Sequence, residues 1–274
     1  MKNLLLILIL SIFSIDAPAQ DSASFASQYL PMHKYVLKIS SEMKLTTTFS
    51  GSDSMLQALK DGGVRNPTTS ERSFIVDGTS TTGATDKNQV TPITTIFEVK
   101  DGKGNVIIPQ GSGFAGSVHA DEMPVYNSII LAAANDTATK KILPLTKNML
   151  QQVSLPDKKM VAGDHYLQTT PMTIPVSGAA MKIIISIDYI LKAITDSVAS
   201  FELVMAPDFN GHFGTKNAKG TGSGKGTLIY DRVNHFPIIY KMDFDLHLPV
   251  PNQDLPMTID VTEHSYNQYK ISPL

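Results

Sequence analysis

Strict alternation of apolar and polar residues runs through several long stretches of this chain. Between His33 and Phe49 the odd-numbered positions are mostly apolar and the even-numbered positions are mostly charged or polar. The same two-residue period runs through Met181–Ala193 and Ile238–Leu248. Because the side chains of a β-strand point alternately to opposite faces, each stretch predicts a strand with one dry face and one wet face. Such one-sided strands are typical of antiparallel sheets.

Shorter stretches predict further strands, for a total of about eleven. They are Phe74–Thr79, Pro92–Lys100, Asn105–Ile108, Ser128–Ala134, Tyr166–Val176, Ser197–Met205, Lys225–Asn234 and Met257–Tyr266. Long strands twist, so the sheet is expected to curl around its apolar face. The expected fold class is mainly β (a β-rich α+β protein), with a long antiparallel curved sheet that forms an open or near-closed barrel.

Two short helices and two loops are expected beside this sheet. The first helix, Met55–Lys60, follows capping serines and ends at two glycines. The second, Leu145–Val153, is followed by a proline that prevents its extension. The glycine-rich polar stretches Gly78–Asn88 and Phe209–Gly224 are expected to be loops.

The first twenty residues have the pattern of an export signal rather than of a folded element. A single Lys precedes a long apolar run, and Ala17-Pro18-Ala19 offers a cleavage site of the small-x-small type. Residues 1–19 are therefore expected to be a signal peptide cleaved near Ala19-Gln20, and the protein is expected to be periplasmic or extracellular. Residues 20–274 are expected to form a single β-rich domain, with two halves that meet near 136–145 as the alternative.

The composition narrows the classes of function. The 274 residues include 23 Lys and Arg, 25 Asp and Glu and no Cys, and the formal net charge is −2. A near-neutral charge argues against a nucleic-acid surface. The lack of Cys excludes disulfides, a thiolate zinc site, a Cys nucleophile and a lipoprotein anchor at Cys. After the signal, no apolar run approaches the ~20 residues of a membrane span, so none is expected in the mature chain.

Two glycine-rich stretches are similar to nucleotide-binding loops but fail on their surroundings. Gly111–Gly116 matches the GxGxxG pattern, yet too few residues follow before Pro124 for the helix that a dinucleotide site requires. Gly220–Thr227 has Gly226 where a phosphate loop places a Ser or Thr after its Lys. Both are expected to be connecting segments, and no cofactor is expected.

Three acidic and histidine motifs are candidates for chemistry. Asp243, Asp245 and His247 share one face of a predicted strand and are a weak candidate for a metal site, although ligands in one row rarely converge. A solvated strand face explains the same row without an ion. His119 and His165 are candidates for a hydrolase, which would also need a Ser or a metal within reach.

The second half of the chain carries an order of motifs that resembles a known family. Leu155, Pro156, Val161, Gly163 and Asp164 fit a "LP…V..GD.W" element, with Tyr166 near the aromatic position. Gly224, Gly226 and Asp231 fit a later "G.G…D" hairpin. Over residues 140–250 the chain thus resembles the DUF6263 type of secreted Bacteroidetes proteins of unknown function. The resemblance implies a secreted, β-rich protein and no particular activity.

The apolar face of the long strands is the place where function is expected. A noncatalytic protein that binds an apolar ligand or a lipidated partner would use the concave side of the sheet. The expected ligand-binding residues are Tyr189, Met181, Ile185, Met242, Phe244 and Phe201. Methionines in or beside the strands are typical of adaptable binding surfaces and, more often, of ordinary cores. The alternatives are an envelope structural or interaction protein with a filled core, and a hydrolase; the oligomeric state is open.

Overall fold

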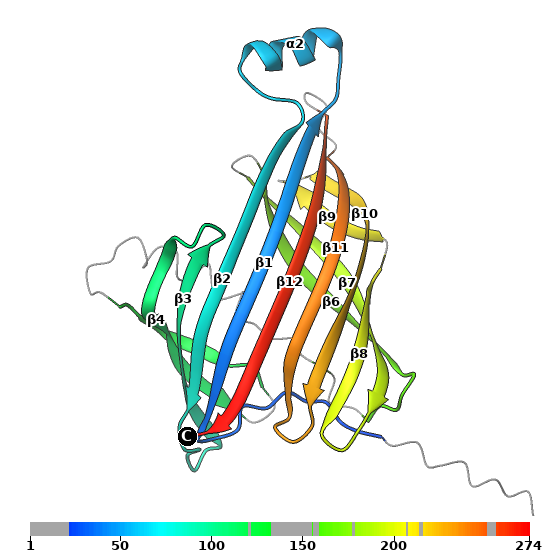
Figure 1. The fold of residues 1–274 in the computed structure, drawn as a ribbon. Coiled ribbons are helices and arrows are strands. Elements are labelled where there is room, and N and C mark those ends of the chain that lie inside the picture. The colour runs from blue at the N-terminus through cyan, green and yellow to red at the C-terminus, as the bar shows by residue number, and fades with distance from the viewer. Residues whose placement is uncertain are drawn as a thin grey trace, which may run out of the picture.

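A computed structural model gives the structure of the protein (Figure 1). It describes residues 22–119, 122–132, 155, 159–176, 179–206, 208–213, 216–250 and 256–274. Within these ranges the chain forms one antiparallel sheet of twelve strands and one helix. The mainly β fold class is therefore confirmed. No helix in the described ranges is long and apolar enough to cross a membrane.

The strands are long, and most of them extend beyond the bounds predicted from the sequence. They are β1 His33–Phe49, β2 Thr68–Thr82, β3 Val90–Asp101, β4 Val106–His119, β5 Val125–Ile130, β6 His165–Val176, β7 Ala179–Ile194, β8 Val198–Met205, β9 Asp208–Phe213, β10 Lys216–Asp231, β11 Phe236–Val250 and β12 Met257–Pro273. The three strands predicted from the clearest alternation appear as β1, β7 and β11.

The two ends of the chain are joined in the middle of the sheet. The strand order is β5-β4-β3-β2-β1-β12-β11-β10-β8-β7-β6, and β9 pairs β10 and β7 off this path. The first and last strands, β1 and β12, pair along their whole length from His33↔Pro273 to Phe49↔Met257. The path begins at β5 and ends at β6, so the sheet is open and the near-closed barrel is not confirmed.

Alternation sorts the side chains onto two faces. In β1 the side chains of Tyr35, Leu37 and Ile39 are buried, whereas those of Lys34 and Lys38 are exposed. We call the face with the buried side chains the inner face and the opposite one the outer face. Buried inner side chains form two clusters, one over β7, β8 and β10–β12 and a smaller one over β1–β4. The core is thus made by the sheet curling around its own apolar face.

An N-terminal strap, residues 22–32, packs against one end of the inner face. The ring of Phe25 is fully buried and meets the rings of Phe201 and Tyr230 edge to face, with centroids 5.0 and 5.3 Å apart. The hydroxyl of Tyr230 donates to the carbonyl oxygen of Ala26 at 2.6 Å. In Figure 1 the strap runs along the end of the sheet at which the C-terminus lies. The strap therefore covers apolar side chains that this end would otherwise expose.

One of the two predicted helices is confirmed. Helix α2, Asp53–Asp61, begins after Ser52, whose hydroxyl accepts from the backbone N–H of Met55, and ends at Gly62. It buries none of its residues and stands beyond the end of the β1–β2 hairpin (Figure 1). The second predicted helix, Leu145–Val153, and the predicted meeting point of two halves near 136–145 lie outside the described residues.

The predicted glycine-rich loops are wrong in large part. Residues 209–224 were expected to be a loop, yet the structure places them mostly in β9 and β10, and β2 extends to Thr82. Gly111–Gly116 lies within β4, so no helix follows it as a dinucleotide site requires. Glycine at these positions allows close approach of neighbouring backbone: a Cβ on Gly113 would overlap the carbonyl oxygen of Thr95. Glycine here serves strand packing rather than a turn.

Candidate functional site

The inner-face residues predicted to bind a ligand lie in the larger core cluster. Ile185, Tyr189, Phe201, Met242 and Phe244 are all on the inner face and at most 5% exposed. They come from β7, β8 and β11, and they pack against one another. Met181 lies in β7, and its side chain is outside the described part of the structure. Because the other five side chains are buried, a bound molecule would first contact the less buried side chains around them on the inner face.

A band of partly exposed side chains borders this core on the inner face. Met43 and Leu45 of β1, Tyr166 of β6 and Tyr240 of β11 pack against the cluster while keeping part of their surface open. Glu263 of β12 lies between two of these strands, because it pairs with Met43 on one side and with Phe244 on the other. We call Met43, Leu45, Tyr166, Tyr240 and Glu263 the inner band.

Glu263 places a carboxyl group among apolar neighbours. Burial raises its pKa, and this outweighs the hydrogen bond from Ser41 and the nearby His264, which lower it. The Ser41 hydroxyl, itself 5% exposed, donates to Oε1 of Glu263 at 3.3 Å. A carboxyl group in such a place destabilises its own charged form unless a hydrogen-bond donor or a cation faces it.

Tyrosine hydroxyls join the two walls of the curled sheet. A side-chain hydrogen bond links Tyr189 of β7 to Tyr240 of β11, and the Tyr166 and Tyr189 ring centroids are 6.2 Å apart. Strands β8 and β10 lie between β7 and β11 in the sheet, so this bond spans the concave side. Burial raises the pKa of Tyr240 to about 12 and that of Tyr189 further still. Both hydroxyls therefore stay neutral and act as hydrogen-bonding groups rather than as acids or bases near pH 7.

The candidate metal row pairs with the neighbouring strand instead of gathering around an ion. On the outer face, Asp243 Oδ1 lies 2.8 Å from Nδ1 of His264, and His247 Nδ1 lies 2.7 Å from Oδ1 of Asp260. Asp245 accepts from the Thr262 hydroxyl at 2.6 Å. Among the described residues no group of three or more His, Asp or Glu side chains could hold a metal ion. The row is thus a ladder of cross-strand pairs.

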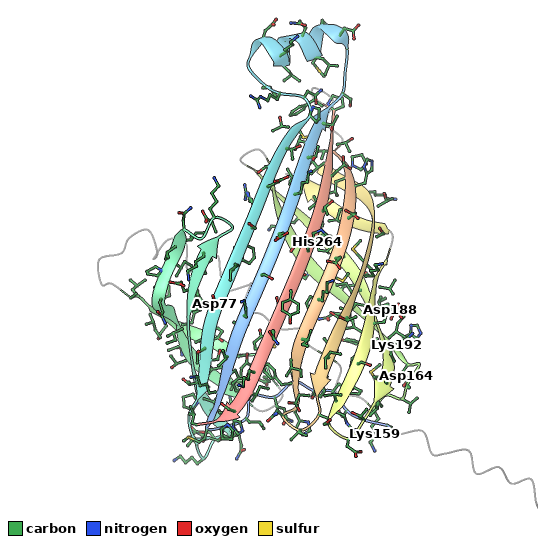
Figure 2. All side chains as sticks on the ribbon, in the orientation of Figure 1. Asp77, Lys159, Asp164, Asp188, Lys192 and His264 are labelled. Carbon is green, nitrogen blue, oxygen red and sulfur yellow. The ribbon has the colours of Figure 1, made fainter. Side chains whose placement is uncertain are left out.

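The two candidate hydrolase histidines also lie on solvated surface. Nδ1 of His165 lies 2.7 Å from Oδ2 of Asp188, and the His165 side chain is 59% exposed. Asp188 and His264 lie well apart in Figure 2, so the His165–Asp188 pair and the His264–Asp243 pair do not converge on one site. His119 is exposed at the end of β4, where its carbonyl accepts from the N–H of Glu122 at 3.1 Å. The hydrolase therefore gains no support from these two sites.

The Gly163-Asp164 pair forms the turn that leads into β6. Gly163 has a φ of +95°, and its N–H donates to the carbonyl oxygen of Leu191 at 2.7 Å. The Asp164 carboxylate accepts from the backbone N–H of Val161 at 2.9 Å. Asp164 thus stabilises the turn from which the chain enters β6.

Comparison with known proteins identifies neither a family nor a function for this chain. No family model matches the chain, and no curated protein matches it significantly. Among solved structures, a mutant of the Rh. blastica porin is 7% identical, with 86% of this chain and 100% of that chain covered and a TM-score of 0.23. The resemblance to the DUF6263 type stays a prediction from the sequence.

Proposed function

We propose that this is an exported, noncatalytic protein that binds an amphiphile, either a free apolar ligand or the lipid of a lipidated partner, on the inner face of its sheet. The observation that carries the proposal is the inner band, in which partly open apolar surface on Met43 and Leu45 lies beside the carboxyl group of Glu263. In a water-soluble β-sheet the inner face is normally filled, so open apolar surface there indicates a place for a ligand.

An amphiphile suits this band better than a wholly apolar or a wholly polar molecule. Each methylene that leaves water contributes about 0.8 kcal/mol, so an alkyl chain along Met43 and Leu45 would supply most of the affinity. Glu263 and the neighbouring Ser41 hydroxyl would hold a polar head group at the same place. The hollow of about 960 Å³ that Met43 shares with polar and charged side chains such as Glu42 and His264 offers an alkyl chain a poorer place.

A structural or interaction protein of the cell envelope is the second candidate. It is favoured by the near-complete burial of the five predicted ligand-binding side chains that the structure describes, out of six, which is typical of a filled core. The two candidates differ in what happens at the inner band. In a ligand-binding protein the ligand displaces water from the inner band. In a structural protein the inner band is only the partly exposed edge of the core and binds nothing.

The test is native mass spectrometry of the protein purified from a bacterial envelope without detergent. The proposal predicts an adduct with the mass of an amphiphile that organic solvent removes. Leu45→Glu places a charge on the inner band and should abolish the adduct. Val36→Glu is the matched control, because Val36 lies on the same strand but on the outer face and is 42% exposed. A folded wild-type protein without an adduct, which also takes up no added amphiphile, favours the structural candidate.

A further inference from the structure

Two hydrogen-bond acceptors on the inner face have fewer donors than their burial calls for. Oε1 of Gln168 is buried and has no hydrogen-bond partner within the described structure. Glu263 accepts from Ser41 alone among the side-chain bonds of the described residues, and no ion pair there joins it to a cation. A buried acceptor without a donor loses its hydration without compensation, and a carboxylate loses more than a neutral group does. Both groups would therefore gain from a ligand that donates.

The pairing register puts these two acceptors on one row of the sheet. Gln168 of β6 and Glu263 of β12 are the two ends of that row, and the residues between them all point to the inner face: Ile187, Met205, Gly224 and Phe244. The Tyr189–Tyr240 hydrogen bond brings β7 and β11 together across the concave side. Gln168 and Glu263 each lie one strand outside that contact, so they flank it on opposite walls.

Two side chains of opposite charge flank Met43 on the inner face. On the inner face, Met43 separates Glu263 from the exposed Arg72 of β2, which lies two strands away. No ion pair joins Arg72 to an acid in the described structure. Of these two charged groups the carboxyl group of Glu263 is the less exposed, and an anionic head group placed beside it would be repelled.

We propose that the ligand's head group is a positively charged hydrogen-bond donor, an alkylammonium, which Glu263 binds as an ion pair while Gln168 Oε1 accepts a further N–H bond. This inference rests on the proposed function, since it names the chemistry of the ligand at the same inner band. The alkyl chain lies along Met43 and Leu45. The ammonium group replaces the solvation that Glu263 loses on folding, which a neutral or anionic head group does not.

The experiment compares three probes with the same chain and different heads: dodecylammonium, dodecanol and dodecanoate. Each is titrated into the purified full-length protein by calorimetry at pH 8, below its micelle concentration. Charge-assisted hydrogen bonds are about twice as strong as neutral ones, so dodecylammonium should bind about tenfold more tightly than dodecanol. Dodecanoate should bind most weakly.

Two variants and one control assign the preference to these residues. Glu263→Gln should lower the affinity for dodecylammonium to that for dodecanol and leave dodecanol unchanged. Gln168→Met should weaken both donating probes by about fivefold, which is the size expected from one lost hydrogen bond. Glu202→Gln is the matched control, because Glu202 lies on the outer face and pairs with Lys192, and it should change nothing.

The outcomes separate this inference from the proposed function. Equal affinities for the three probes, or an ammonium preference that survives Glu263→Gln in a folded protein, would overturn the inference and leave amphiphile binding standing. Tightest binding of dodecanoate, lost in Arg72→Gln, would overturn it in favour of an anionic ligand. If none of the three probes binds to the folded wild type, the proposed function itself fails.

Discussion

The glycine-rich part of β10 can be tested by substitution, because the sign of the change in unfolding free energy shows whether residues 220–226 form a strand or a flexible loop. Gly224 pairs with Phe244 of β11 and with Met205 of β8. A Cβ added to Gly224 would lie 2.8 Å from Cβ of Phe244, 3.0 Å from Cε of Met242 and 3.1 Å from the carbonyl oxygen of Asp243. Ordinary carbon contacts are about 3.5–4.0 Å, so Gly224→Ala forces the strands apart by about 0.5–1 Å.

The expected cost follows from two opposing effects. Overpacking of this kind costs about 1–3 kcal/mol. Alanine also restricts the unfolded chain, which contributes about 0.4–1 kcal/mol in the other direction. The free energy of unfolding should therefore fall by about 1–2 kcal/mol. If residues 220–226 were instead a flexible loop, only the second effect would act and Gly224→Ala would stabilise the protein.

Urea unfolding, followed by circular dichroism and tyrosine fluorescence, measures this change in a chain that has no Trp. Ser223→Ala is the control, because Ser223 is the next residue and points to the exposed outer face. It should change the free energy of unfolding by no more than about 0.5 kcal/mol. A stabilising Gly224→Ala, or equal effects of the two substitutions, would refute the claim that Gly224 lies in a strand and faces the packed inner side of the sheet.

Three further predictions test other parts of the account. Phe201→Ala should lower the free energy of unfolding by about 3–5 kcal/mol, whereas Val204→Ala on the exposed side of β8 should lower it by about 0.5 kcal/mol. Similar losses in urea unfolding would contradict the placement of Phe201 on the inner face and Val204 on the outer face. Tyr230→Phe removes the hydroxyl that donates to the N-terminal strap, so chymotrypsin should cut the strap faster, and an unchanged cleavage rate would argue against that anchor. Burial raises the pKa of Glu263 above its ordinary 4.5, so the folded state holds this proton more tightly than the unfolded state. The contribution of Glu263 to stability therefore falls as the pH rises from below 4.5 through the higher pKa of the folded state. Glu263→Gln should thus melt at a higher temperature than the wild type at pH 8 and show no such gain at pH 4, and an equal gain at both pH values would contradict a raised pKa.

The alternation of apolar and polar residues was sufficient to predict the long strands. His33–Phe49 is a strand with the bounds that the pattern gave, and its buried odd positions follow the same alternation. The pattern works because one face of each strand is dry and the other is wet. Helix α2 was predictable from a different signal, the capping serine before it and the two glycines after it.

Glycine misled the sequence analysis because it has two structural uses. In β10 the glycines at 220, 222, 224 and 226 alternate with larger residues, and the pairing places all four on the inner face. Neighbouring side chains such as Met242 and Phe244 fill the space above them. Composition alone suggested a loop, whereas the two-residue period of the glycines was a signal for a strand whose inner face has no side chains of its own.

Glu263 was missed because the sequence analysis followed only apolar residues. In β12 the inner positions begin with Met257, Ile259 and Val261, and the same period continues to Glu263. The alternation within the predicted strand Met257–Tyr266 already places this carboxyl group on the dry face. The cross-strand partners of Asp243, Asp245 and His247 could not be predicted, because they depend on the register between β11 and β12.

The central claim is that the inner band receives an amphiphile. The most direct test is NMR of ¹³C-methyl-labelled methionines during titration with dodecanol, since Met43 lies in the inner band and Met32 is 51% exposed outside it. The account predicts a saturable shift of the Met43 methyl signal while the Met32 signal stays in place. A Met43 signal that does not move, whether dodecanol binds elsewhere or not at all, would contradict the account.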